Sequence, residues 1–197
     1  AGRQSSLKVD VYNAGETVVA CSIAVLGVGA EWLTIAPPTV ELMNGEQKTV
    51  EVRIVSPRAA TSRAGEYPLH LSAIDQTGQQ AGTASATIDL LPFASFGAGL
   101  SPTTTPAGKP MIASIENKGN AAAKYQLLCR SLDGKLGFTP ESEQVAVEAG
   151  ATLPLQFTAR PLKRRWIGHA ETASFEVAVT AEVDKSKEIL KGEAVCP

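Results

Sequence analysis

The feature that most constrains the fold is an internal repeat. An Asn-x-Gly motif at residues 13–15 precedes an apolar stretch, and the same motif recurs at residues 117–119, a spacing of 104 residues. At this spacing Tyr125, Leu127 and Cys129 align with residues 21, 23 and 25 of the first stretch. The second part of each copy matches as well, because Asn44-Gly45-Glu46 and Ala149-Gly150-Ala151 each precede an alternating apolar run. The chain is therefore predicted to contain two copies of one unit.

Within each copy, apolar residues alternate with polar or small ones. Each run ends at a turn signal such as Asn44-Gly45, Gln76-Thr77-Gly78 or Asp133-Gly134, and this pattern is typical of half-buried strands joined by tight turns. The clearest runs are Leu7, Val9, Val11; Val19, Cys21, Ile23, Val25; Val50, Val52, Ile54; Tyr67, Leu69, Leu71, Ala73; and Ala84, Ala86, Ile88, Leu90.

One stretch also fits a helix. Residues 121–128, Ala-Ala-Ala-Lys-Tyr-Gln-Leu-Leu, have good helix propensity and a partial helical spacing of apolar residues. The repeat favours a strand, since these residues align with an alternating run in the first copy.

The length of 197 residues suits two small domains. We predict an all-β fold of two tandem immunoglobulin-like (fibronectin III-like) β-sandwiches, with domains at residues 1–92 and 93–197 joined by a short linker near Pro92. The second copy has an opening segment, about residues 99–108, that the first copy lacks. We expect the opening strand of the first copy to be missing, to lie upstream in a longer natural protein, or to come from another chain.

Several of these motifs resemble a known family. The Asn-x-Gly motif, Trp32-Leu33 before Pro37-Pro38, Asn44-Gly45-Glu46 before a V-x-V-x-I run, and Ala64–Tyr67 are similar to the bacterial immunoglobulin-like repeats of the NPCBM-associated and alpha-galactosidase-associated type. They also resemble the related cell-adhesion repeats of large bacterial surface and membrane proteins. The second copy departs from the pattern at residues 167–170, where it has no Tyr. The resemblance implies a β-sandwich spacer or binding module, and it carries over no catalytic residues.

Charge and composition limit the partners. The formal net charge is −2, which gives no reason to expect a nucleic-acid partner. No apolar run reaches the roughly 18 residues of a membrane span, so we expect no direct membrane insertion in this segment. The first residues show neither an initiator Met nor a signal-type apolar region, and we expect a mature product or a piece of a longer, extracytoplasmic or cell-surface protein.

The sequence contains few residues of the types that usually carry catalysis. The sequence has two histidines, His70 and His169, and no motif of a nucleophile elbow, a zinc protease, a phosphate-binding loop or a calcium loop. Glu141 and Glu143 are close in sequence, but a solvated loop explains them better than a glycosidase pair. We therefore predict no catalytic residues, no metal, no cofactor and no enzyme activity.

The three cysteines are far apart in the sequence. Cys21, Cys129 and Cys196 form no metal-binding or redox pair, and an odd number leaves at least one thiol free. We expect small buried side chains, with a Cys129–Cys196 disulfide as the alternative.

Two groups of residues are candidates for binding. Lys163, Arg164, Arg165 and Trp166 place three cations beside an aromatic ring and form a candidate binding loop for an anionic surface, a glycan or a nucleic acid. A solvated loop with a packed Trp166 is the simpler interpretation. Trp32 is a candidate for stacking on a sugar, although core packing explains it as well.

Together these observations predict a non-catalytic tandem spacer or interaction module of a larger bacterial surface or membrane-associated protein. The expected partners are neighbouring domains of the same polypeptide or another protein. The alternative is a carbohydrate-binding accessory region of a secreted glycoside hydrolase.

Overall fold

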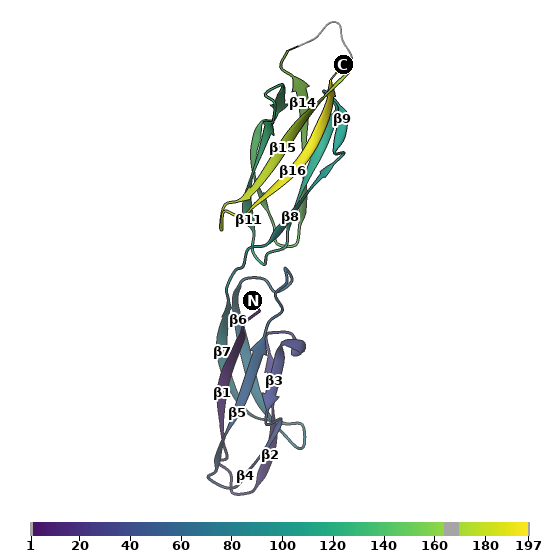
Figure 1. The fold of residues 1–197 in the computed structure, drawn as a ribbon. Helices are drawn as coiled ribbons and strands as arrows, with labels where there is room; N and C mark the ends of the chain where they lie inside the picture. Colours follow the sequence, from purple (N-terminus) through teal and green to yellow (C-terminus); the bar gives the residue numbers. More distant parts are fainter. Residues whose placement is uncertain (1, 164–169, 197) are drawn as a thin grey trace. The chain divides into compact units, whose positions relative to one another are not determined.

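The computed structural model describes residues 2–163 and 170–196, and its chain divides into two compact units. Unit 1 comprises the chain up to Arg58 and Ser62–Pro92, and unit 2 comprises Ala59–Thr61 and the chain from Phe93 onward. Both units are built from β-strands (Figure 1), as the alternating pattern predicts. The one helical element described is a short 3₁₀ turn, η1 (Ala30–Trp32).

Unit 1 contains seven strands in two sheets. One sheet has the order β1-β5-β3 and the other the order β4-β2-β6-β7, with antiparallel pairing in both. The strands are β1 (Gln4–Tyr12), β2 (Val19–Leu26), β3 (Leu33–Ala36), β4 (Thr39–Leu42), β5 (Gln47–Val55), β6 (Gly65–Asp75) and β7 (Gln80–Leu90).

Unit 2 repeats this arrangement and adds two strands. Its sheets have the orders β12-β14-β10-β8 and β13-β11-β15-β16-β9. The strands are β8 (Phe96–Ser101), β9 (Thr104–Pro106), β10 (Pro110–Asn117), β11 (Ala123–Ser131), β12 (Leu136–Thr139), β13 (Ser142–Val147), β14 (Thr152–Pro161), β15 (Glu171–Ala181) and β16 (Lys187–Cys196).

The topology is that of an immunoglobulin-like sandwich, which confirms the predicted fold class. In unit 2, β8, β10, β14 and β12 take the places of strands A, B, E and D, while β11, β15 and β16 take those of C, F and G. Unit 1 has counterparts of all of these except β8, and it also lacks the short β9 that pairs in parallel with β16. Within residues 2–92, no strand pairs with β1 at the place that β8 occupies beside β10.

A tyrosine at the start of β6 gives unit 1 another immunoglobulin-like feature. The Tyr67 hydroxyl donates a hydrogen bond to the carbonyl of Arg63, four residues upstream, at 2.8 Å. This is the arrangement of a tyrosine corner, which fixes the chain as it enters strand F.

Each unit has its own hydrophobic core between its two sheets. In unit 1 the core includes Val50, Val52 and Leu69, which are fully buried. In unit 2 it includes Phe157 and Phe175, which meet edge to face with ring centroids 6.0 Å apart. In the stretch with competing helix propensity, residues 123–128 lie in strand β11, as the repeat predicted, and residues 121–122 precede it. Tyr125 and Leu127 both face this core.

The repeated Asn-x-Gly motif has the same role in both units. The amide nitrogen of Asn13 donates to the carbonyls of Thr17 and Leu42, and its oxygen accepts from the N–H of Gly15. Asn117 makes the equivalent three bonds to Ala121, Val147 and Gly119. Each asparagine therefore links the end of a strand in one sheet to the other sheet. The two units thus share these hydrogen bonds as well as the sequence motif.

The predicted turns are present and are closed by carboxylates. Gly78 follows Asp75 with φ +82°, in the region that favours glycine. The Asp75 carboxylate accepts hydrogen bonds from the Thr77 hydroxyl and from the N–H groups of Thr77 and Gln79. These bonds, led by the one from the Thr77 hydroxyl, hold the pKa of Asp75 below its ordinary value.

Candidate interaction site

An apolar groove of about 370 Å³ opens at the edge of unit 1, between β1 and β7. One wall is the second half of β1, from Val9 to Asn13, and the other is the start of β7, from Ala81 to Ala84. The floor consists of core side chains from three other strands. They are Cys21, Ile23, Leu42 and Leu71. The groove thus reaches from solvent to the core of unit 1.

In unit 2 the corresponding place is filled by β8. This strand pairs antiparallel with β10, so that Phe96, Ala98 and Leu100 lie opposite Asn117, Ile115 and Ala113. All three side chains pack against the core of unit 2. By the 104-residue repeat, their three partners on β10 correspond to Asn13, Val11 and Val9, which line the groove in unit 1.

The burial of equivalent residues shows the effect of the missing strand. Met111, Ala113 and Ile115 on β10 are completely buried. Their counterparts on β1 face the same way, but all three are only half-buried; they are Leu7, Val9 and Val11. The core of unit 1 is therefore less completely covered along this edge than the core of unit 2.

This groove was not among the sites predicted from sequence. The sequence signal for it was the opening segment, which is present only in copy two. This difference indicated that copy one has no counterpart of β8 beside its first strand. The sequence did not show that core side chains such as Cys21 would line a groove there.

Trp32, the predicted sugar-stacking residue, lies on η1. Its side chain is half-buried and packs on the core of unit 1. Its ring lies tilted against that of Tyr67, with centroids 6.0 Å apart. Part of the indole surface is thus occupied by protein contacts, and sugar stacking by the remainder stays a prediction.

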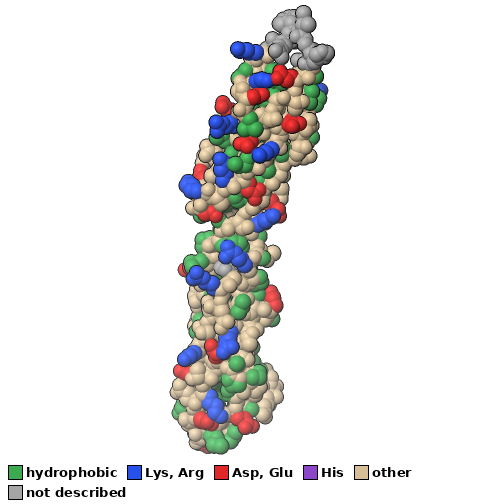
Figure 2. Space-filling model, viewed as in Figure 1, with side chains coloured by type: hydrophobic (Ala, Val, Ile, Leu, Met, Phe, Trp, Pro, Cys, Tyr) green, Lys and Arg blue, Asp and Glu red, His purple; other side chains and the backbone are tan. Residues whose placement is uncertain are grey.

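The predicted cationic loop lies largely outside the described residues. Lys163 follows β14 and is exposed, whereas Arg164, Arg165 and Trp166 are outside the described part of the chain. The binding role of these four residues stays a prediction. On the face shown in Figure 2, Lys and Arg side chains alternate with Asp and Glu side chains along both units.

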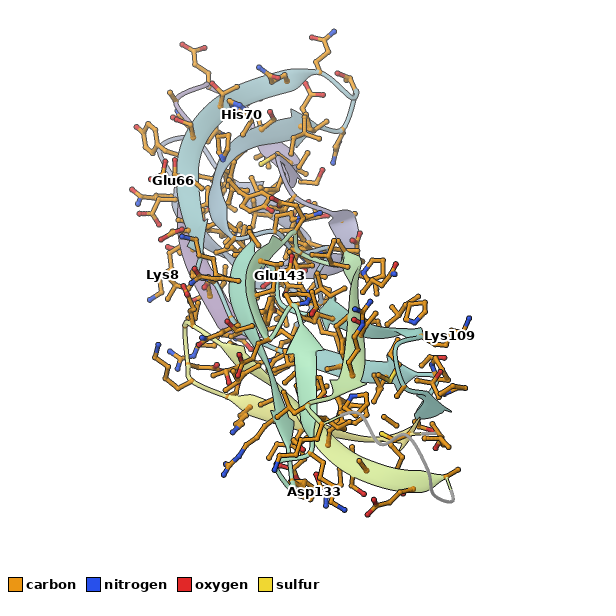
Figure 3. The ribbon with its side chains drawn as sticks, turned by 90° about the horizontal axis from the view of Figure 1, so that it is seen from above. Lys8, Glu66, His70, Lys109, Asp133 and Glu143 are labelled. Carbon is orange, nitrogen blue, oxygen red and sulfur yellow. The ribbon has the colours of Figure 1, made fainter. Side chains whose placement is uncertain are left out.

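The residues considered for catalysis belong to different units or lie outside the described residues. His70 lies on β6, exposed and on the face opposite Leu69, as predicted, while Glu143 lies on β13 of unit 2 (Figure 3). Glu141 is exposed in the turn before β13, and His169 is outside the described residues. Within residues 2–163 and 170–196, no three His, Cys, Asp or Glu side chains form a group able to hold a metal ion.

Among the described residues, no helix is long and apolar enough to cross a membrane.

The three cysteine thiols are free, so the alternative Cys129–Cys196 disulfide is not formed. Cys21 and Cys129 are buried as expected, and Cys196 is half-buried.

The buried thiol of Cys129 leads to a prediction about alkaline stability. Burial, with a smaller contribution from Glu141, raises the pKa of Cys129 from 9.0 to about 12. Above pH 9 the unfolded chain loses this proton and the folded chain keeps it. The stabilisation is therefore complete below pH 9 and is lost as the pH rises toward 12.

We expect the free energy of unfolding of unit 2 to fall more steeply over this pH range in the natural chain than in Cys129→Val. Urea denaturation at pH values from 8 to 11, followed by circular dichroism, measures the difference. Parallel curves for the two proteins would contradict the assignment.

Comparison with known proteins shows distant likeness to solved structures. No protein-family model and no curated protein sequence matches the chain. The D00-D0 domain of intimin is similar at 13% identity, with 98% of this chain and 92% of that chain covered and a TM-score of 0.37. The Yersinia pseudotuberculosis adhesin InvE is similar at 11% identity (98% and 60% covered, TM-score 0.39). The Pseudomonas aeruginosa CupB2 chaperone is similar at 11% identity (95% and 91% covered, TM-score 0.32).

Proposed function

We propose that the chain is a non-catalytic tandem immunoglobulin-like module that acts as a spacer and interaction unit in a larger bacterial surface or membrane-associated protein. In this proposal residues 1–92 and 93–197 are separate folding domains located outside the cytoplasm. Their partners are neighbouring domains of the same polypeptide or another protein. The observation that carries the proposal is that each unit has a separate hydrophobic core of its own.

The connection between the units supports a spacer role. Only residues 91–95 separate the end of β7 from the start of β8. Within this segment the N–H of Phe93 donates to the side-chain oxygen of Asn120, and the carbonyl of Ser95 accepts from the N–H of Lys118. The end of the connection is therefore hydrogen-bonded to unit 2.

We also propose that the units are of the NPCBM-associated type. The support is the sequence resemblance, above all at residues 64–67. These residues lead into β6 and include the hydroxyl donor of the tyrosine corner, Tyr67.

Pulling the chain from its two ends tests the proposal. Two separate unfolding events are expected, because each domain resists force with its own sandwich. At about 3.5 Å per residue, the contour length should grow by roughly 30 nm for unit 1 and roughly 35 nm for unit 2, less the folded length of each. Single-molecule force spectroscopy measures both values.

Tandem repeats of one unit would serve as the control for counting events. A single event that releases the whole chain would contradict the proposal of two separate domains. An event for unit 2 alone would show that unit 1 does not act as a mechanical unit.

A further inference from the structure

We propose that the edge groove of unit 1 binds an extended polypeptide segment from outside residues 1–197. The segment would add to β1 as an antiparallel strand and would insert large apolar side chains at alternate positions. This inference gives the interaction role of the proposed function a site and rests on that role. The spacer role depends instead on the two separate cores, so the two can fail independently.

Both strands that border the groove are edge strands. In the described part of the chain β1 pairs with β5 alone, and β7 pairs with β6 alone. An edge strand presents backbone N–H and C=O groups that can pair with an added strand. In unit 2 the equivalent edges are covered, because β8 pairs with β10 and β9 pairs with β16.

Strand β8 serves as a template for the register of the added segment. Phe96, Ala98 and Leu100 project into the core of unit 2 from alternate positions. The Phe96 ring reaches Tyr125 at a centroid distance of 5.2 Å. Leu100 passes beside Gly192, where an added Cβ would lie 2.9 Å from the Leu100 side chain. A segment in the same register in unit 1 would place its three inward side chains over the groove.

The groove in unit 1 has room for larger side chains than those of β8. Tyr125, which meets Phe96, is replaced by Cys21 at the equivalent position. The pairing of β6 with β7 and of β15 with β16 also makes Ala84 the counterpart of Leu190. Both replacements are smaller, so the ligand must supply the missing volume.

One polar contact of β8 has no equivalent in unit 1. The N–H of Ala98 donates to a carboxylate oxygen of Glu188 at 2.8 Å. In unit 1 the corresponding position on β7 is Gly82, which has no side chain. The added segment would therefore be held by backbone pairing with β1 and by apolar contacts, and a charged side chain opposite β7 is not required.

Two synthetic peptides test the inference on the full 197-residue chain. The first has the sequence of residues 93–101, Phe-Ala-Ser-Phe-Gly-Ala-Gly-Leu-Ser, with two lysines added for solubility. The second carries the changes Phe96→Trp and Ala98→Leu. We expect saturable 1:1 binding of both in fluorescence anisotropy, with the second peptide tighter by about tenfold because it fills more of the groove.

A substitution in the chain separates specific from general binding. Ala84→Leu restores the side chain that unit 2 has at this position. It should weaken the enlarged peptide by about tenfold and change the first peptide little, because Leu190 and β8 coexist in unit 2. Ala84 is exposed, so the variant is expected to fold.

Hydrogen exchange locates the bound peptide. Protection should increase at β1 and leave β10 unchanged, because β10 already has its partner. A peptide in which both Phe96 and Leu100 are replaced by Ser should bind at least about tenfold more weakly.

The absence of saturable binding would overturn the inference, and so would equal binding of the Ser-substituted peptide. Protection that does not include β1 would overturn it as well. Self-association of the chain through β1 in analytical ultracentrifugation, without peptide binding, would assign the groove to a second copy and would also overturn it.

Discussion

Replacing Phe175 with alanine is expected to lower the free energy of unfolding of unit 2 by about 3–5 kcal/mol. The Phe175 side chain is completely buried, and its ring contacts those of Phe138 and Phe157 at centroid distances of 5.6 and 6.0 Å. Removing it leaves a cavity beside the Phe138 and Phe157 rings. Urea denaturation of unit 2, followed by segment-resolved hydrogen exchange, measures the loss.

Phe175 also lies close to strand β8, next to Gly192. A Cβ on Gly192 would lie 2.4 Å from the Phe175 ring and 2.9 Å from Leu100. Glycine at 192 therefore lets the ring and the leucine approach each other above strand β16. The Phe175→Ala change should loosen β8 as well as the core, and exchange of the β8 amides should increase.

The matched control lies in unit 1. Strand register makes Leu69 the counterpart of Phe175, and Leu69 is also completely buried. Leu69→Ala should destabilise unit 1 by about 2–5 kcal/mol. If each substitution lowered exchange protection equally in both units, the two cores would not be independent.

Much of the fold could be predicted from the sequence, because a sandwich strand alternates its side chains between core and solvent. The Leu7, Val9 and Val11 alternation predicted β1 within three residues of its start. The repeat correctly assigned most of residues 121–128 to a strand, which begins at Ala123, despite their helix propensity. Local propensity there gave way to the burial of Tyr125 and Leu127.

The candidate site was harder to predict, since it depends on which strands become neighbours. The opening segment was predicted as one stretch, but the structure divides it into β8, on one sheet, and β9, on the other. The constant offset also fails after β2. Val9 corresponds to Ala113 at 104 residues, whereas their partners Val50 and Leu155 are 105 apart. By strand pairing, Leu71 and Val177 are 106 apart, so the loops of the second copy are longer.

Replacing Asn117 with alanine is expected to destabilise unit 2 by about 3–5 kcal/mol, although it removes only one small polar side chain. Asn117 is 1% exposed and bonds two carbonyls and one N–H. After the change these three backbone groups lose their side-chain partner, and an unsatisfied buried group costs about 1–3 kcal/mol. Thermal and urea unfolding of unit 2 measure the effect.

A further variant at the same position separates the loss of hydrogen bonds from the loss of side-chain volume. Asn117→Asp keeps the oxygen that accepts from Gly119 and removes the two N–H donors to Ala121 and Val147. It should therefore lose at least as much stability at neutral pH, because its negative charge would face two carbonyl oxygens. A protonated Asp can donate one hydrogen bond, so part of the loss should be recovered at low pH.

Asn13→Ala provides the test in unit 1. Asn13 makes the same three bonds as Asn117 but is 7% exposed and lines the open groove. Water can reach its partners more easily, so the loss in unit 1 should be smaller than the loss in unit 2. If a strand filled the groove, water would be excluded and the two losses should become similar. Equal losses without a bound strand would show that the missing β8 leaves Asn13 as well shielded as Asn117.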